Sequence, residues 1–239
     1  MVHANAIRAA AIGLLLLLMT SGTGGCNVIG VVASKLPQPP ELAKVDLSAR
    51  LIADAKIDSK NDAPTTNSVA VIVWSDRGLN VDWPLLRNDL SGQLLSRLKK
   101  AQTEKAKTLA GVMFPYSSEQ VVRWQRDNPA AEALPVTEIA KMLKVDRLIY
   151  LEIVDFKTRT SEAFELFRGE VRVTLKVIAV DDKGNASVIY DESGISVHFP
   201  RTAPEDGTPK GSDRVMYAGV ITETADELTR RFVSSEARN

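Results

Sequence analysis

The run SVAVIVW at residues 68–74 constrains the fold more than any other stretch of the chain. It is apolar throughout and rich in valine, and the turn-like sequence Ser75-Asp76-Arg77-Gly78 follows it. A strand with one wet face alternates polar and apolar residues, so an unbroken apolar run indicates a strand that is buried on both faces. The folded part of the chain is therefore expected to begin with a buried strand.

The next segment carries a helical repeat. Leucines recur at every fourth position, at Leu86, Leu90, Leu94 and Leu98. This spacing places them on one face of an amphipathic helix that packs on the first strand. Asp82 and Pro84 are residue types that favour a helix start, so we expect the helix to begin there.

Further elements follow from capping, turn and periodicity signals. Ser117 and Gln120 form a capping-box pattern, and Gly194 is a position for a β-bulge. The period-two pattern of 170–180 indicates a strand with one buried face. After the first helix we predict a short strand at 110–114, helices at 117–128 and 136–145, and strands at 146–156 and 170–180. A turn at 181–185, a returning strand to Phe199 and a loop at 200–211 follow. The last predicted element is a helix capped by Ser212, with apolar positions Val215, Ala218, Ile221, Ala225, Leu228 and Phe232.

The element order defines the expected fold class. It reads strand, helix, strand, helix, helix, strand, strand, strand, helix, which predicts an α/β (α+β) domain with a mixed sheet of about five strands and helices packed on it. We assign this single domain to residues 66–239. Hydrophobic residues make up 44% of the chain and charged residues 25%, which is enough apolar material for a packed core.

The N-terminal segment has the three-part layout of a secretory signal. MVHANAIRAA carries one basic residue, Arg8, and no acid, and it leads into AAIGLLLLLM and the small-residue stretch TSGTGG. Crossing a bilayer takes about 20 apolar residues, roughly twice the length of this run. We therefore expect a signal peptide at 1–25 rather than a membrane-spanning helix.

Cys26, the one cysteine of the chain, follows Gly24-Gly25 directly. With the leucine run before it, this segment resembles the lipobox of bacterial lipoproteins, although Thr23 and Gly24 depart from the usual residues. The resemblance implies lipidation of Cys26 and an anchor in the cell envelope. Asn27, where an Asp would signal retention in the inner membrane, points to the periplasmic side of the outer membrane. The alternative is a secreted protein that is cleaved near Gly25.

Residues 26–65 are expected to form the lipidated N-terminus and a tether. Pro37, Pro39 and Pro40 interrupt regular structure and favour an extended chain. The stretch 42–55 could form a helical turn or two, but a helix of that length is marginal without a surface to pack on.

The domain resembles one found at the N-terminus of the translocation protein TolB and in curli-secretion and penicillin-binding-protein-activator lipoproteins. The segments that carry the resemblance are VAVIVWSDRG, EIAKMLKVDRLIYLEI and VRVTLKVIAVDDKGNASVIYDESG. It implies an α/β architecture in an envelope setting. That family commonly has Gly where this chain has Lys144, and a left-handed backbone there would cost about 1 kcal/mol.

The residues offer little for catalysis, cofactors or metals. His3 and His198 are the two histidines of the chain, and His3 lies in the expected signal peptide. No Ser-His-Asp or Cys-His set, zinc ligand set or glycine-rich phosphate loop can be assembled. We therefore predict no catalytic residue, no cofactor and no metal site. Thirty basic and thirty acidic residues cancel, which argues against nucleic acid as a partner.

The expected interaction surface consists of Asp76, Arg77, Asp82 and Trp83, just beyond the carboxyl end of the first strand. Open α/β sheets form binding crevices at that end, and Trp and Arg are enriched at interface hot spots. In the alternative interpretation, Asp82 caps a helix, Trp74 belongs to the core and 75–78 is only a turn.

The predicted function is that of a non-catalytic binding or assembly factor, anchored in the envelope through the lipid on Cys26. Its expected partners are the membrane and another envelope protein, and the oligomeric state is left open. One rival is a subunit of a secretion or pore assembly. The other is an enzyme that uses carboxylates and Arg in a cleft.

Overall fold

The computed structural model describes residue 47 and the ranges 67–104, 109–160, 166–202 and 206–233. The expected signal peptide, Cys26 and, apart from Leu47, the expected tether at 26–65 lie outside the described residues. None of the helices in the described ranges combines the length and the apolar composition needed to cross a membrane.

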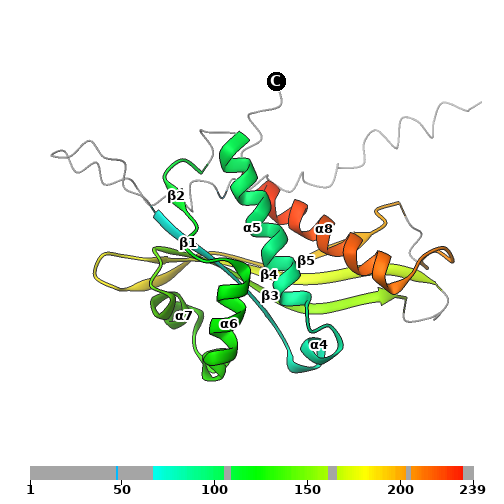
Figure 1. Cartoon of the computed structure of the whole chain (residues 1–239), viewed down its shortest axis with the longest axis horizontal. Coiled ribbons are helices and arrows are strands. Elements are labelled where there is room, and N and C mark those ends of the chain that lie inside the picture. Colours follow the sequence, from blue (N-terminus) through cyan, green and yellow to red (C-terminus); the bar gives the residue numbers. More distant parts are fainter. Residues whose placement is uncertain (1–46, 48–66, 105–108, 161–165, 203–205, 234–239) are drawn as a thin grey trace, which may run out of the picture. The chain divides into compact units, whose positions relative to one another are not determined.

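The described residues form a five-stranded mixed sheet (Figure 1). Its order is β2-β1-β3-β4-β5, with β1 parallel to both β2 and β3, and with β3, β4 and β5 antiparallel. The strands are β1 (Asn67–Ser75), β2 (Val112–Met113), β3 (Arg147–Arg159), β4 (Phe167–Val180) and β5 (Ala186–Phe199). The predicted fold class and element order are confirmed.

Helices cover the sheet on both faces, as the two core clusters show. On one face α5 and α8 pack on the sheet, and on the other lie α6, the 3₁₀ helix η1 and α7. The helices are α4 (Arg77–Asp82), α5 (Leu86–Glu104), α6 (Ser118–Asp127), η1 (Pro129–Ala133), α7 (Val136–Leu143) and α8 (Asp213–Phe232).

Strand β1 contributes alternate side chains to the two cores. Val69, Val71 and Val73 join one core cluster, and Ala70, Ile72 and Trp74 join the other. Burial on both faces removes the need for polar residues at every second position. This arrangement confirms the buried strand that the run SVAVIVW predicted.

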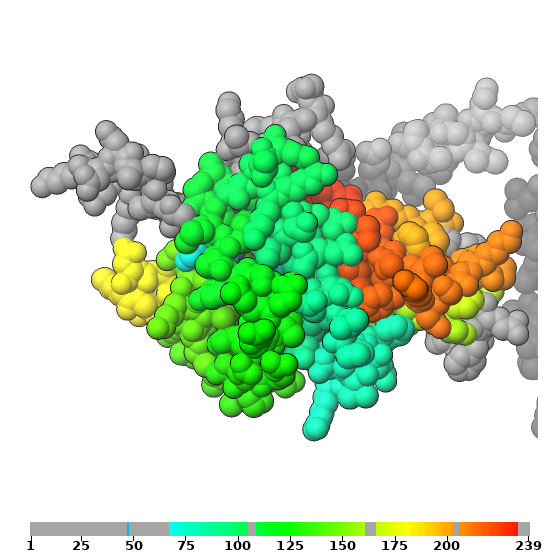
Figure 2. Space-filling view, viewed as in Figure 1, coloured from blue at the N-terminus to red at the C-terminus, as the bar shows by residue number. Residues whose placement is uncertain are grey.

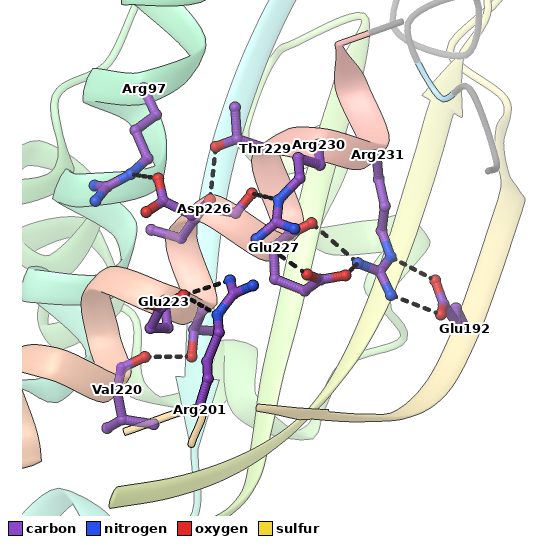
Figure 3. Close-up of polar contacts among 12 residues, drawn as sticks. Arg97, Glu192, Arg201, Val220, Glu223, Asp226, Glu227, Thr229, Arg230 and Arg231 are labelled. Atoms are coloured by element: carbon purple, nitrogen blue, oxygen red, sulfur yellow. Dashed lines mark hydrogen bonds and ion pairs between the residues drawn. The ribbon is translucent and has the colours of Figure 1, made fainter. Parts of the chain in front are cut away.

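Helices α5 and α8 lie side by side over one face of the sheet (Figures 1 and 2). Thr222 donates a hydrogen bond to Gln93, and one turn later Arg97 is ion-paired with Asp226 (Figure 3). Because both contacts advance by four residues on each helix, the two helices run parallel.

The predicted capping box, the Ser212 cap and the bulge at Gly194 are confirmed. Ser117 and Gln120 form the predicted capping box of α6, and Ser212 accepts the N–H of Val215 at the start of α8. Gly194 has φ +76 within a register shift between β4 and β5, as expected for a bulge. Lys144 adopts the left-handed conformation, with φ 52 and ψ 50, and ends α7.

Three local expectations were wrong. The residues after β1 are not only a turn, since Asp76 accepts the N–H of Leu79 at 2.7 Å and starts helix α4. Asp82 is the last residue of α4 rather than the cap of α5, which begins at Leu86. On α8, Val215 and Ala218 are exposed, because Met216 and Val220 turn to the core in their place.

Leu47 lies within the expected tether, yet it is fully buried. It belongs to the core cluster under α8, and its N–H donates a 2.6 Å hydrogen bond to the carbonyl of Arg231. The side chain of Arg231 binds both carboxylate oxygens of Glu192, at 2.9 and 3.0 Å, and also Glu227 (Figure 3). At Leu47, therefore, the expected spacer contributes to the core.

Candidate functional site

A pocket of about 410 Å³ opens at the carboxyl end of β1, beside the middle of β3. The chain leaves β1 to form β2 on one side of it and then returns to form β3 on the other side. This reversal is the topological switch point at which open α/β sheets bind ligands. The volume lies within the range of about 300–1,000 Å³ that is common for ligand pockets. The lining residues are Trp74, Ser75, Asp76, Glu132, Tyr150, Glu152, Ile153 and Val154.

The inner wall carries polar atoms that have no partner among the described residues. Trp74 and Ser75 are each only 6% exposed, and neither the indole Nε1 nor the hydroxyl Oγ makes a hydrogen bond there. Gln125, which does not line the pocket but contacts β1 at Val73, is 4% exposed, donates from Nε2 to the carbonyl of Val73 and leaves Oε1 unpaired. An unsatisfied buried polar group costs about 1–3 kcal/mol, so several in one place are unusual for a site of purely structural role.

Arg87 lies behind the pocket wall. Its guanidinium carbon is 6.0 Å from the centre of the Trp74 ring, and its Nε is buried without a partner among the described residues. Partial burial lowers the pKa of Arg87, and the carboxylate of Glu132 opposes this shift. Arg87 is therefore a half-buried cation that interacts electrostatically with Glu132, one of the acids that line the pocket.

Three carboxylates, those of Asp76, Glu132 and Glu152, belong to the lining, and no basic residue does. Asp76 uses one oxygen to start α4. Glu132 and Glu152 are exposed and make no ion pair within the described part of the chain. Burial, followed by the charges of Glu152 and Glu132, raises the pKa of Tyr150 to about 12. The Tyr150 hydroxyl is thus protonated at neutral pH, in a negative environment.

The structure separates the four residues of the expected interaction surface. Asp76 lines the pocket, whereas Arg77 and Asp82 are exposed at the two ends of α4. Trp83 lies on the other face of the sheet, where its ring packs edge-on to Phe156 at 5.2 Å and stacks on Tyr217 at 5.4 Å. That these four residues form the partner surface stays a prediction.

Sequence reasoning missed Glu132, Tyr150 and Glu152. A signal for two of them was present, because Tyr150 and Glu152 occupy alternate positions of the otherwise apolar LIYLEIV and so share one face of a strand. Nothing local marked Glu132, which reaches the pocket through η1. The 3₁₀ helix itself was not predicted.

Two further features bound the chemistry of the domain. In the described ranges, no group of three or more His, Cys, Asp or Glu residues could hold a metal ion.

A second, smaller pocket of about 230 Å³ lies between α6 and α7. Its lining is mostly apolar and consists of Tyr116, Gln120, Val121, Trp124, Met142 and Leu143.

Neither a protein-family model nor a curated protein matches the chain. Among solved structures, it is similar to the PelC dodecamer from Paraburkholderia phytofirmans, at 12% identity and TM-score 0.40, over 72% of this chain and 90% of that one. The hypothetical protein CT253 from Chlamydia trachomatis has 16% identity and TM-score 0.40, over 72% and 100%. Lipoprotein GNA1162 from Neisseria meningitidis has 12% identity and TM-score 0.35, over 68% and 98%.

Proposed function

We propose that this protein is a non-catalytic binding or assembly factor of the bacterial cell envelope. Its α/β domain holds a partner protein in the pocket at the carboxyl end of β1, while the lipid on Cys26 keeps it at the membrane. The observation that carries the binding role is the pocket itself, in which Trp74 and Ser75 are buried with polar atoms that the described residues leave unpaired.

The membrane anchor rests on the sequence. The leucine run and Gly25-Cys26 support a lipidated N-terminus, and Asn27 supports the periplasmic side of the outer membrane. Each buried CH₂ contributes about 0.8 kcal/mol, and two acyl chains suffice for stable attachment. A protein held in this way meets its partner at the membrane surface.

The non-catalytic role rests on the residues available. The carboxylates of the pocket are accompanied by Tyr150 and Ser75, without a histidine to activate the hydroxyl. The rival role, hydrolysis by paired carboxylates, would place the reaction on Glu132 and Glu152.

The test blocks the pocket without changing its charge. Val154 is 48% exposed at the pocket, so Val154→Trp fills the opening, and Val188→Trp is the matched control on β5, where Val188 is 43% exposed. Cells expressing each full-length variant are treated with a short crosslinker, and the adducts are isolated from intact membranes and quantified by mass spectrometry.

We expect an envelope protein that is captured by the wild type and by Val188→Trp, and at least about tenfold less by Val154→Trp. Equal capture by all three proteins would contradict a binding role for this pocket. Thermal unfolding of each variant checks that the domain remains folded.

A further inference from the structure

We propose that the pocket binds a basic side chain, the guanidinium of Arg or the ammonium of Lys, presented by a peptide segment of the partner. This inference rests on the proposed function for its protein partner and adds the chemistry of the contact.

The pocket lining carries negative charge. Many carboxylates of this domain form an ion pair with a nearby Lys or Arg. Asp213 pairs with Arg159, and Glu192 pairs with Arg231. No cation of the described residues forms an ion pair with Glu132 or Glu152, and, unlike other exposed acids without an ion pair, these two line a pocket. Acids that line a concave site and form no ion pair there favour a cationic ligand.

Arg87 does not remove this excess. It lies outside the lining and acts on Glu132. One positive charge offsets at most one of the three carboxylates that line the pocket. The lining therefore keeps a net negative charge toward its opening.

The buried indole of Trp74 lies at the same pocket. This residue lines the pocket, is 6% exposed, and has an Nε1–H donor with no acceptor among the described residues. A bare inorganic cation would leave that donor unpaired, and the described acids form no group able to hold a metal. Nε1 is itself enclosed, so the indole must turn toward the pocket for a peptide carbonyl to accept its N–H while the basic side chain meets the acids.

Part of the pocket wall is apolar. Val154 is 48% exposed at the pocket, and Trp74 also belongs to the lining. Long basic side chains bury their methylene stems on apolar surface while the charged end stays near solvent and acids. The combination of an apolar wall with unpaired carboxylates fits such a side chain better than a compact ion.

The test uses the full-length protein in detergent with ¹⁵N-labelled tryptophan. The indole signals of Trp74, Trp83 and Trp124 are recorded by NMR, and Trp74→Phe assigns the pocket signal. The probes are acetyl-Gly-Arg-Gly-amide, the matching peptide with citrulline, which has nearly the same shape without the charge, and spermidine. The variant Glu132→Gln/Glu152→Gln removes the unpaired acids, and Glu104→Gln/Asp206→Asn is an exposed control with the same charge change.

We expect the Arg peptide to shift the Trp74 signal, and the citrulline peptide or the pocket variant to weaken this response by about tenfold or more. The control variant should respond as the wild type does. Equal responses to Arg and citrulline would overturn the proposal, and so would a response to spermidine but not to the Arg peptide.

If no cation binds while Val154→Trp still abolishes capture in cells, the cation assignment fails and the proposed function stands. Cation binding in vitro with unimpaired capture by Val154→Trp would contradict the proposed function instead.

Discussion

Gln125 of α6 donates a 2.9 Å hydrogen bond from Nε2 to the carbonyl oxygen of Val73 in β1. Strand β2 pairs only with Asn67 and Ser68, so in the described structure the rest of this edge of β1 has no neighbouring strand. A side-chain amide therefore takes the place of a strand at the end of β1 that leads into the pocket. The contact joins the edge of the sheet to the helix that covers it.

Replacing Gln125 by Leu should destabilise the domain. The carbonyl of Val73 would lose its partner in a buried position, at a cost of about 1–3 kcal/mol, which removal of the unpaired Oε1 of Gln125 offsets in part. Chemical denaturation measures this change, with Arg123→Leu on the exposed side of α6 as the control. An unchanged midpoint for Gln125→Leu would show that this hydrogen bond contributes nothing.

Leu47→Ala should destabilise the domain although the residue lies in the expected tether. Its side chain is fully buried in the core under α8, and truncating a buried leucine costs about 2–5 kcal/mol. Denaturation of the full-length protein tests this prediction. A loss below about 0.5 kcal/mol, as is typical of surface positions, would mean that Leu47 does not pack there in solution.

The ion pair between Asp213 and Arg159 predicts a pH dependence of stability. Hydrogen bonds from Arg159, then from Thr158, lower the pKa of Asp213 to about 2, against about 3.9 in an unfolded chain. A lowered pKa gives stability that is fully present above the unfolded value and is lost as the pH falls through the folded value. Part of the stability should therefore disappear between about pH 4 and pH 2. In Asp213→Asn this part of the pH profile should flatten, whereas Asp206→Asn, an exposed control, should keep it.

Cys26 should carry the lipid. Mass spectrometry of the protein purified from membranes should find an N-terminal peptide that begins at a lipid-modified Cys26, because the chain offers no other thiol. Cys26→Ser should move the protein from the membrane fraction to the soluble fraction. A soluble wild-type protein with a free thiol would contradict the anchor.

The sequence predicts the elements of this fold well because their signals are local. The unbroken apolar run before Ser75, the Ser117 cap and the Ser212 cap each depend on a few neighbouring residues. The sequence does not distinguish helix α4 from a turn at Asp76, because Asp is common both in turns and at helix caps. Val215 was misplaced because apolar spacing on α8 fits two adjacent faces, and only packing on the sheet chooses between them.

The site was harder to predict because it is assembled from distant segments. Asp76 was expected from its place after the first strand, but Glu132 and Glu152 meet it only through the order of the strands. Trp74 and Trp83 look alike in sequence, yet they lie on opposite faces of the sheet. Which tryptophan lines a pocket thus depends on the turn geometry between β1 and α5.

A photo-crosslinking residue placed at three equally accessible positions tests most directly whether the pocket is the contact surface. Val154 lies at the pocket, Met142 at the groove between α6 and α7, and Val188 on β5, with exposed fractions of 48%, 43% and 43%. In living cells we expect an adduct with an envelope protein from Val154 and none from the other two positions. Adducts of equal yield at all three positions, or an adduct at Met142 or Val188 without one at Val154, would contradict the account.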